Sequence, residues 1–256
     1  MAIITLDNVT PVGFGAFKIG RNQGIKYPAG YDLPDEASAT KLLGGVLDLG
    51  VNYIDTAPSY GLSEERIGKA IGHRRGEFLL ATKVGETFEG GQSTYDFSAD
   101  AIEASVRRSL ERLRTDVLDL VLIHAPRDDL RVLESTDVVA VLQGMREKGM
   151  IRGIGFSGHT VEAFRSALDF SDAIMATYHE DDTTLAPLLD EAAGRGVRVI
   201  VKKGLAAGRL DPDRAIRFAL NHPAVTTVAI GTLNLDHLRG NLEVARAAVR
   251  KAADGS

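Results

Sequence analysis

The chain has 256 residues, of which 44% are hydrophobic and 25% are charged, and its formal net charge is -5. This length suits one or two domains, or one α/β barrel of about 250 residues. The absence of cysteine excludes disulfides, thiolate nucleophiles and cysteine-ligated metals. Because the chain is mildly acidic and has no basic cluster, membrane-length apolar run or signal-peptide pattern, we expect a cytoplasmic protein that binds neither nucleic acid nor membrane.

Along the chain, short apolar runs alternate with amphipathic helical patterns. Most runs are continuous and rich in Val, Ile and Leu, which is typical of strands buried on both faces. The helical patterns begin at caps such as Ser63 and often end at Gly. A polar loop is expected up to Phe97, after the third strand, and a helix around 134–148. The expected strands are 12–17, 51–55, 78–83, 117–124, 151–157, 172–179, 197–203 and 226–231.

These elements form eight strand–helix units. Parallel strands need such crossover connections, and eight of them in this length predict a single (β/α)8 TIM barrel with an eight-stranded parallel core. No linker or composition shift divides the chain, so we expect one domain over residues 1–256. The segment GIGFSG (153–158) fits G-x-G-x-x-G and raises the alternative of two Rossmann-like halves. It falls in the fifth unit, however, and Asp169 and Asp172 follow too early for that fingerprint.

In a barrel, functional residues gather where the strands end and the following loops begin. Polar residues stand at four such positions in succession, and a tyrosine stands in the loop after the second strand. We expect all five side chains to converge on one mouth. They are Asp55, Lys83, His124 and Ser157, at the ends of the second to fifth strands, and Tyr60.

Together these groups suit the reduction of a carbonyl. A tyrosine has an ordinary pKa of about 10, and an ammonium group such as that of Lys83 would lower it. Asp55 would keep Lys83 charged, and His124 could donate a hydrogen bond that orients a substrate oxygen. Since none of these side chains carries electrons, the electrons would come from a cofactor.

These residues and their surroundings resemble the aldo-keto reductase family, in a bacterial type with a short C-terminus. The matching segments run in order through nearly the whole chain: GVNYIDTAPSYGLSEERIGKAIG, LLATKVG, LDLVLIH, GMIRGIGFSG, HPAVTTVAIGT and HLRGNLEVA. The resemblance implies that Tyr60 is the proton donor, that Lys83 and Asp55 tune it, and that His124 orients the carbonyl. It also implies hydride transfer between a nicotinamide cofactor, with NADPH slightly favoured over NADH, and an aldehyde, ketone or sugar carbonyl.

The resemblance further implies a set of cofactor-binding residues. Ser157 matches a residue that binds the nicotinamide carboxamide, whereas Gly158 stands where the family usually has Asn and Met175 where it often has Gln. The loop VKKGLAAGRL (201–210) would pass over the pyrophosphate. Gly231 and His237 replace a Lys and an Arg that often hold the 2′-phosphate. The predicted set is Ser157, Gly158, Met175, Lys203, Gly204, Leu205, Gly231, Thr232, His237 and Asn241.

The substrate pocket is expected between two loops. The loop 85–97 offers Phe88, Tyr95 and Phe97 as walls, and the loop 21–32 offers a second side. The chain stops soon after a last helix expected at about 234–252, so we expect an open pocket. The expected partner is a small-molecule carbonyl substrate, and the chain is expected to be a monomer or a small homo-oligomer.

Two other functional classes stay open at this point. A nucleotide-binding regulatory protein of the same fold, like the channel subunits among the relatives, would bind cofactor without turning over carbonyls. A barrel hydrolase would use paired carboxylates or a metal. The segment HEDD (179–182) contains metal-ligand residue types, but one His beside acids more often marks a loop, and we expect no metal site.

Overall fold

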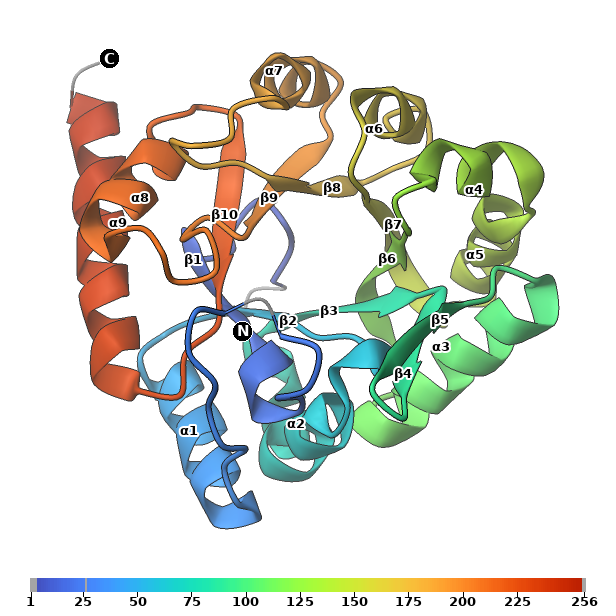
Figure 1. Ribbon diagram of the computed structural model, residues 1–256, viewed down its shortest axis with the longest axis horizontal. Coiled ribbons are helices and arrows are strands. Elements are labelled where there is room, and N and C mark those ends of the chain that lie inside the picture. Colours follow the sequence, from blue (N-terminus) through green and yellow to red (C-terminus); the bar gives the residue numbers. More distant parts are fainter. Residues whose placement is uncertain (1–3, 26, 255–256) are drawn as a thin grey trace.

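The computed structural model describes residues 4–25 and 27–254, and its centre is a closed barrel of parallel strands (Figure 1). Around the barrel the strands follow the order β1-β10-β9-β8-β7-β6-β3-β2. The barrel confirms the expected (β/α)8 fold and excludes an open sheet of two Rossmann-like halves. Its strands are β1 (Val12–Gly15), β2 (Tyr53–Asp55), β3 (Leu79–Val84), β6 (Leu118–His124), β7 (Ile151–Ser157), β8 (Ala173–Thr177), β9 (Arg198–Lys202) and β10 (Val225–Ile230).

Helices surround the barrel and connect its strands. Within the described part of the chain, none of them is long and apolar enough to cross a membrane. Side chains cap several of them: Asp35, for example, accepts a hydrogen bond from the backbone N–H of Ser38. The helices are α1 (Glu36–Asp48), α2 (Ser63–Ile71), α3 (Ala99–Leu113), α4 (Asp129–Ser135), α5 (Val138–Glu147), α6 (Val161–Ala167), α7 (Ala186–Gly194), α8 (Pro212–Leu220) and α9 (Leu235–Asp254).

Three local predictions differ from the structure. Ser63 is the first residue of α2 rather than its cap, and its buried hydroxyl donates to the carbonyl of Ala16 instead. The helix expected around 134–148 corresponds to α5 but begins only at Val138, because Thr136 adopts an extended conformation between α4 and α5. The expected polar loop up to Phe97 contains an antiparallel hairpin of β4 (Glu86–Glu89) and β5 (Gln92–Tyr95).

The interior of the barrel explains why polar groups collect at one end. Side chains alternate between the inside and the outside of each strand. The inward positions are apolar over most of their length and form one cluster: Tyr53, Leu79, Ala81, Leu120, Leu122, Ala173, Met175 and Ile200. Continuing the alternation by two residues gives Asp55 after Tyr53 and Lys83 after Ala81. The same step places His124 after Leu122 and closes the apolar interior with a polar layer.

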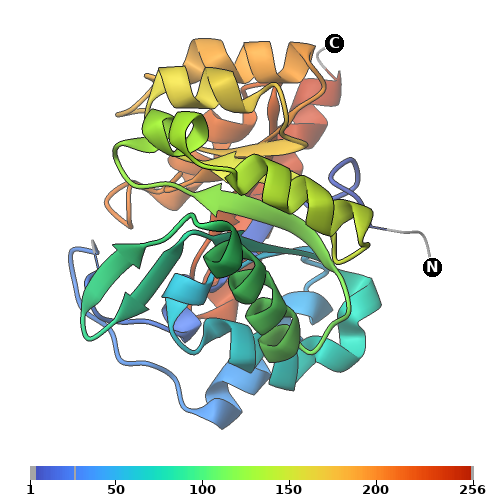
Figure 2. The same ribbon diagram turned by 90° about the vertical axis from the view of Figure 1, so that its right-hand side faces the viewer.

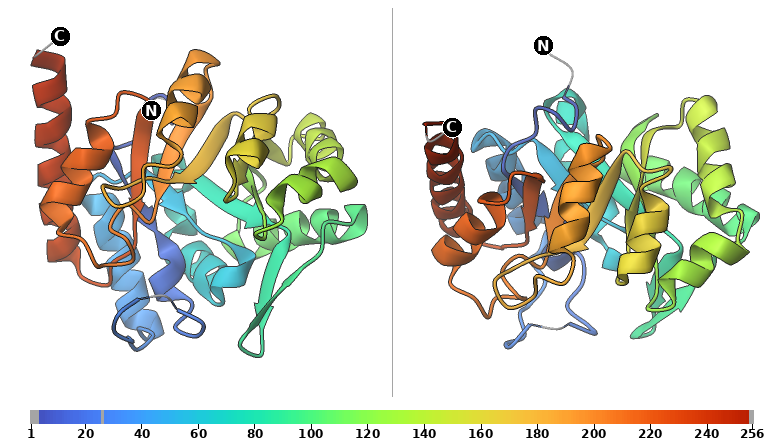
Figure 3. Two further views of the ribbon diagram at one scale, coloured as in Figure 1. Left: turned by 45° about the horizontal axis from the view of Figure 1, so that its top comes forward. Right: turned by 90° about the horizontal axis from the view of Figure 1, so that it is seen from above.

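The two ends of the barrel differ in what they carry. The β4–β5 hairpin and the loop of residues 21–32, of which residue 26 lies outside the described residues, project from the end where the strands finish (Figure 2). Figure 3 shows the same hairpin standing away from the helices. The segment of residues 4–11 lies at the opposite end.

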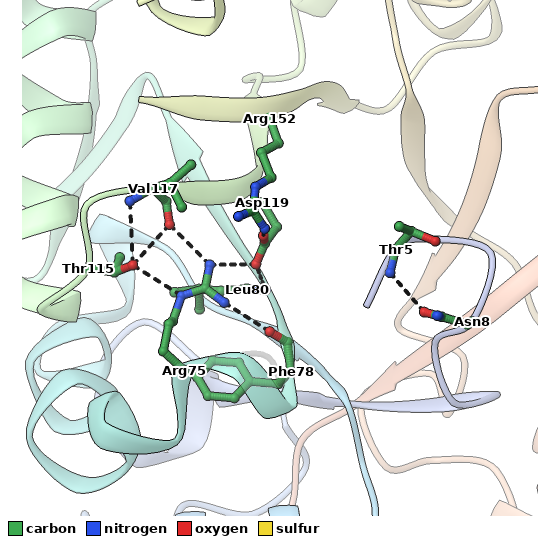
Figure 4. A network of polar contacts seen from close by, with 9 residues as sticks. All are labelled: Thr5, Asn8, Arg75, Phe78, Leu80, Thr115, Val117, Asp119 and Arg152. Carbon is green, nitrogen blue, oxygen red and sulfur yellow. Dashed lines mark hydrogen bonds and ion pairs between the residues drawn. The ribbon is translucent and has the colours of Figure 1, made fainter. Parts of the chain in front are cut away.

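A buried carboxylate links two strands near the start of β6. Asp119 accepts hydrogen bonds from Arg75 and Arg152, each at 2.5 Å, and from the backbone N–H of Leu80 at 2.8 Å. Arg75 also donates to the carbonyls of Phe78 and Val117 (Figure 4). Since His124 stands at the other end of the same strand, we assign this network to stability.

Candidate active site

The charged centre of the barrel mouth is the pair of Lys83 and Asp55. Lys83 Nζ donates to Asp55 Oδ1 at 2.6 Å and to the carbonyl of Thr56 at 2.9 Å, and the two side chains are only 1% and 5% exposed. Desolvation lowers the pKa of Lys83, but the attraction of Asp55 and Tyr60 outweighs it, and the net pKa is raised. Lys83 is therefore held as an ammonium ion.

Tyr60 lies beside this pair, at the end of the short 3₁₀ helix η2 (Pro58–Tyr60). Lys83 Nζ is 4.7 Å from the centre of its ring. Burial raises the pKa of Tyr60 to about 12, although the Lys83 ammonium lowers it. Lys83 thus acts in the expected direction, but desolvation of the phenolate is the larger effect, so the net pKa of Tyr60 lies above its ordinary value. The phenol thus keeps its proton at neutral pH.

His124 shares the mouth with Tyr60 but faces a residue that the sequence analysis did not select. The two rings are 6.5 Å apart and nearly perpendicular. His124 Nδ1 lies 2.7 Å from Glu86 Oε2, although the two atoms do not meet the geometry of a hydrogen bond. Burial lowers the pKa of His124, and although Glu86 opposes this effect, the net pKa stays below its ordinary value. His124 is therefore neutral at neutral pH.

Glu86 was missed because its segment was interpreted as a polar loop. The sequence did contain a signal for the hairpin, since the two-residue linker Gly90-Gly91 favours a tight turn between short strands. Both glycines adopt positive φ angles, +57° and +85°. The register then pairs Glu86 with Tyr95 at the base of the hairpin, so that the Glu86 carboxylate reaches into the mouth.

The predicted carboxamide site holds a second residue that the sequence analysis did not select. Lys202 Nζ donates to Ser157 Oγ at 2.9 Å and to the carbonyl of Gly158 at 3.0 Å. Burial, with the positive charges of Lys203 and Lys83, lowers the pKa of Lys202 to about 7. Met175 lies in the neighbouring strand, only 1% exposed among the apolar interior residues.

Steric crowding explains why position 158 is a glycine. A Cβ there would come within 2.3 Å of the Phe156 ring and 2.6 Å of Asp129 Oδ2. Asp129 fills this space because it accepts hydrogen bonds from the backbone N–H groups of His159 and Thr160 and from the Thr160 hydroxyl. An Asn side chain would not fit at position 158 in this arrangement.

The predicted pyrophosphate loop follows directly after β9. Lys203 is exposed and has a φ of +56°, in the left-handed region. Gly204 is buried, and a Cβ there would lie 2.8 Å from the Val228 side chain of β10. Leu205 packs partly against the core. Of these three residues, Lys203 alone presents a charged group to the surface.

The other predicted cofactor residues lie around the start of α9. Thr232 and Asn241 are buried, whereas His237 is exposed. Asn234 Oδ1 accepts hydrogen bonds from the backbone N–H groups of Asp236 and His237, so two of the first amides of α9 already have a partner. A Cβ at Gly231 would lie 3.0 Å from the carbonyl oxygen of Gly15, so the backbones of β1 and β10 approach closely there.

A cavity of about 510 Å³ opens beside the predicted carboxamide site, not over Tyr60 and Lys83. Its lining contains more basic than acidic residues, and burial together with Lys202 and Lys203 lowers the pKa of His159 on its wall to about 4. The cavity therefore suits an anionic group. The lining residues are Arg127, Gly158, His159, Thr177, His179, Asp182, Thr184, Leu185, Lys203, Ala206, Ala207 and Arg209.

The expected substrate walls have different environments. Phe88 lies under the guanidinium of Arg21, 3.2 Å from its ring centre, and this contact joins the hairpin to the loop 21–32. Tyr95 is 44% exposed on the outer strand of the hairpin. Phe97 packs on the backbone of Gly85, where a Cβ would lie 2.1 Å from its ring. Phe97 thus packs against the residue that precedes the hairpin.

The two competing motifs also find structural explanations. The glycines of GIGFSG relieve crowding inside the barrel, since a Cβ at Gly155 would come within 2.4 Å of the carbonyl of Ala173. In HEDD, His179 and Asp182 form a backbone bridge, and Glu180 pairs with Arg214. Among the described residues, no group of three or more His, Asp or Glu side chains is arranged to hold a metal ion.

Comparisons with known proteins agree with this geometry. The sequence profile of the Aldo/keto reductase family matches residues 11–214. The chain is 34% identical over 214 residues to L-galactose dehydrogenase of Arabidopsis thaliana, a match that covers 79% of this chain and 63% of the plant protein.

Solved structures share the whole barrel. A candidate aldo-keto reductase from Pseudomonas aeruginosa superposes with a TM-score of 0.86 at 40% identity, covering 94% of this chain and 91% of that one. The holo form of an aldo-keto reductase from Bacillus halodurans gives a TM-score of 0.79 at 28% identity, covering 95% and 92%. The profile match, the fold and the sequence identity together place this chain in the aldo-keto reductase family.

Proposed function

We propose that the chain is an NAD(P)(H)-dependent oxidoreductase that interconverts an aldehyde, ketone or sugar carbonyl with the corresponding alcohol. The observation that carries this proposal is a protonated phenol beside a buried ammonium at the mouth of the barrel. In reduction, Tyr60 donates its proton to the carbonyl oxygen, and Lys83 stabilises the phenolate that remains. Asp55 holds Lys83 charged and in position. The nicotinamide cofactor, when bound, supplies or accepts the hydride.

The donor set around Ser157 fits a nicotinamide carboxamide, which offers one acceptor and two donor hydrogens. Lys202 supplies donor hydrogens, and Ser157 and the carbonyl of Gly158 supply acceptors. We propose that Lys202 provides the donor that Gly158 lacks. The basic cavity beside it suits the phosphates, with Lys203, Gly204 and Leu205 in the loop that crosses them.

We propose the remaining cofactor contacts around the start of α9. The backbone at Gly231 and Thr232 would contact the phosphates, and Asn241 would contact the adenine. We propose NADPH ahead of NADH, with the exposed His237 as a contact for the 2′-phosphate. Because the plant relative is named for L-galactose, we propose an open-chain or cyclic sugar as the first substrate class to test. The proposed setting is the cytoplasm, with the chain a monomer or small homo-oligomer.

The proposed function can be tested by mixing the protein with NADPH or NADH and a panel of aldehydes, ketones and sugars. Turnover is measured as the fall in absorbance of the reduced nicotinamide. Tyr60→Phe should lower kcat by about 10²–10⁴, because it removes the proton donor, and should leave the cofactor Kd nearly unchanged. Tyr178→Phe, at a tyrosine that packs against Phe218, is the matched control.

Several outcomes would contradict the proposal. Full kcat in Tyr60→Phe would remove its proton-donor role. Tight nucleotide binding without turnover of any carbonyl would favour the regulatory protein. Turnover that is insensitive to nicotinamide, or that is lost on chelation, would favour the hydrolase.

A further inference from the structure

Lys202 brings a cation to the proposed carboxamide site without a carboxylate beside it. Its Nζ donates to Ser157 Oγ at 2.9 Å and to the carbonyl oxygen of Gly158 at 3.0 Å, and both acceptors are uncharged. Lys83, by contrast, donates directly to the Asp55 carboxylate at 2.6 Å. Within the described part of the chain, Lys202 makes no ion pair, and its side chain is half-buried. Its charge is therefore neither balanced by a direct contact nor fully exposed to water.

The surroundings of Lys202 allow it to gain or lose its proton near neutral pH. Burial, with the positive charges of Lys203 and Lys83, lowers its pKa to about 7, and the carboxylates of Asp55 and Asp129 oppose this effect only in part. Lys202 is thus mainly an ammonium ion at pH 6 and a neutral amine at pH 9. The site can carry either charge state within an ordinary range of pH.

Three neighbouring basic groups hold their charge state more firmly. The pKa of Lys83 is raised, so this side chain stays an ammonium ion. Burial lowers the pKa of His159 to about 4 and holds the pKa of His124 below its ordinary value, so that both rings are neutral at neutral pH. Above pH 7, Lys202 is therefore the one of these four side chains that changes its charge.

A charge at this position acts differently on the two redox states of a nicotinamide. The carboxamide is bonded to a ring that carries a positive charge when it is oxidised and no charge when it is reduced. The Lys202 ammonium, which contacts the two groups proposed to hold the carboxamide, repels the oxidised ring and not the reduced ring. The phosphates and the adenosine are the same in both states, so their attraction to the site cancels when the two states are compared.

We propose that Lys202 determines which redox state of the cofactor the site prefers. Its ammonium weakens the binding of the oxidised form relative to the reduced form, and this preference fades as the pH rises and Lys202 loses its proton. The role rests on the proposed function and deepens it, because it makes the affinity for one product depend on a single side chain. Below pH 7 the oxidised cofactor that reduction produces binds more weakly and inhibits the enzyme less.

Proton linkage limits the size of this effect. Binding of the oxidised form can at most remove the Lys202 proton, and below a pKa of about 7 this removal costs one factor of ten in affinity per pH unit. We therefore expect the ratio of the two dissociation constants, oxidised over reduced, to be about five- to tenfold larger at pH 6 than at pH 9. At pH 6 the oxidised form should also release a proton from Lys202 as it binds, and the reduced form should release less.

Isothermal titration calorimetry measures both quantities without turnover. NADP⁺ and NADPH, or NAD⁺ and NADH where these bind more tightly, are titrated into the substrate-free protein at pH 6 and at pH 9. Two buffers of different ionisation enthalpy report the protons released. Lys202→Met removes the charge and should give the same ratio at both pH values. Lys202→Arg stays charged and should hold the ratio high at both.

The controls separate the charge of Lys202 from its other effects. Lys202→Met also loses a hydrogen-bond donor, which raises both dissociation constants, so only their ratio tests the charge. His124 is unchanged in these variants, and any contribution from its titration would therefore remain in Lys202→Met. Lys41→Met, at an exposed position of α1, is the matched control and should keep the wild-type ratio and its pH dependence.

The outcomes distinguish the role of Lys202 from the function on which it rests. A wild-type ratio that is equal at pH 6 and pH 9 would overturn the role and leave the proposed function intact. The same conclusion would follow if Lys202→Met kept the wild-type pH dependence. Binding of neither redox state to the wild-type protein would overturn the proposed function and the role of Lys202 together. Should Lys202→Met fail to fold, the wild-type pH series, its proton release and Lys202→Arg still decide the question.

Discussion

Lys202→Met tests the electrostatics of the mouth through protein stability. Lys202 is half-buried and donates to two oxygens, yet the described structure gives it no carboxylate within hydrogen-bond distance. Its folded-state pKa is about 7, compared with 10.5 for a free lysine side chain. Methionine keeps a similar length and apolar stem but cannot carry the charge. The variant therefore removes an unfavourable buried cation together with two hydrogen bonds.

The sign follows from proton linkage. A lysine whose pKa is lowered on folding costs stability fully below the folded-state pKa, and the cost disappears as the pH rises through the unfolded-state pKa. At about 1.4 kcal/mol per pKa unit, the cost below pH 7 is up to about 5 kcal/mol. The variant also loses two hydrogen bonds, each of which stabilises the wild-type protein by about 1 kcal/mol. Lys202→Met should thus be more stable than wild type by about 2–3 kcal/mol at pH 6.

The assay is urea unfolding of both proteins from pH 6 to pH 9. Over this range the stability advantage of the variant should fall by about 3 kcal/mol, because the linkage cost in wild type falls from its full value to about 2 kcal/mol. Lys41→Met, at an exposed position of α1, controls for the loss of one positive charge. A stability difference that stays constant from pH 6 to pH 9 would refute the assignment of a lowered pKa to Lys202.

Two further substitutions probe the steric and the supporting parts of the structure. Gly158→Ala should lower the free energy of unfolding by about 1–3 kcal/mol, because its Cβ would press against Phe156 and Asp129. An unchanged free energy of unfolding in urea would contradict this prediction and show that the backbone at position 158 can move without cost. Asp119→Asn should cost about 2–4 kcal/mol by breaking the contacts to Arg75 and Arg152, yet leave kcat near wild type. A large loss of kcat with an unchanged Tm would contradict the separation of the two ends of the barrel.

The barrel and most of its polar layer could be predicted because the relevant signals are local. Continuous apolar runs reveal strands buried on both faces, and the side-chain period of two fixes which residues point inward. Asp55 and His124 follow from this rule, since each stands two residues beyond an inward apolar residue. The rule also reaches Lys202, two residues beyond Ile200, whereas the sequence analysis selected its exposed neighbour Lys203.

Glu86 could not be found by the same rule, because no barrel strand carries it. Glu86 begins a hairpin directly after β3, and the turn at Gly90 and Gly91 brings Tyr95 back beside it. The register of a hairpin is set by its turn, and a shift of one residue would direct the carboxylate to the opposite face. The close approach of Glu86 to His124 thus joins an inserted hairpin to a barrel strand, between residues that lie 38 positions apart in the chain.

The pKa of Tyr60 shows a different kind of limit. Its charged partners, Lys83 and Asp55, could be named from their strand positions, but the balance between attraction and desolvation depends on how completely the three groups are buried. Here the burial of Tyr60 is the larger effect, and its pKa rises to about 12. A phenol with so high a pKa gives up its proton only when a stronger base, such as a developing alkoxide, lies against it. The same burial that raises the pKa therefore confines proton release to the step that needs it.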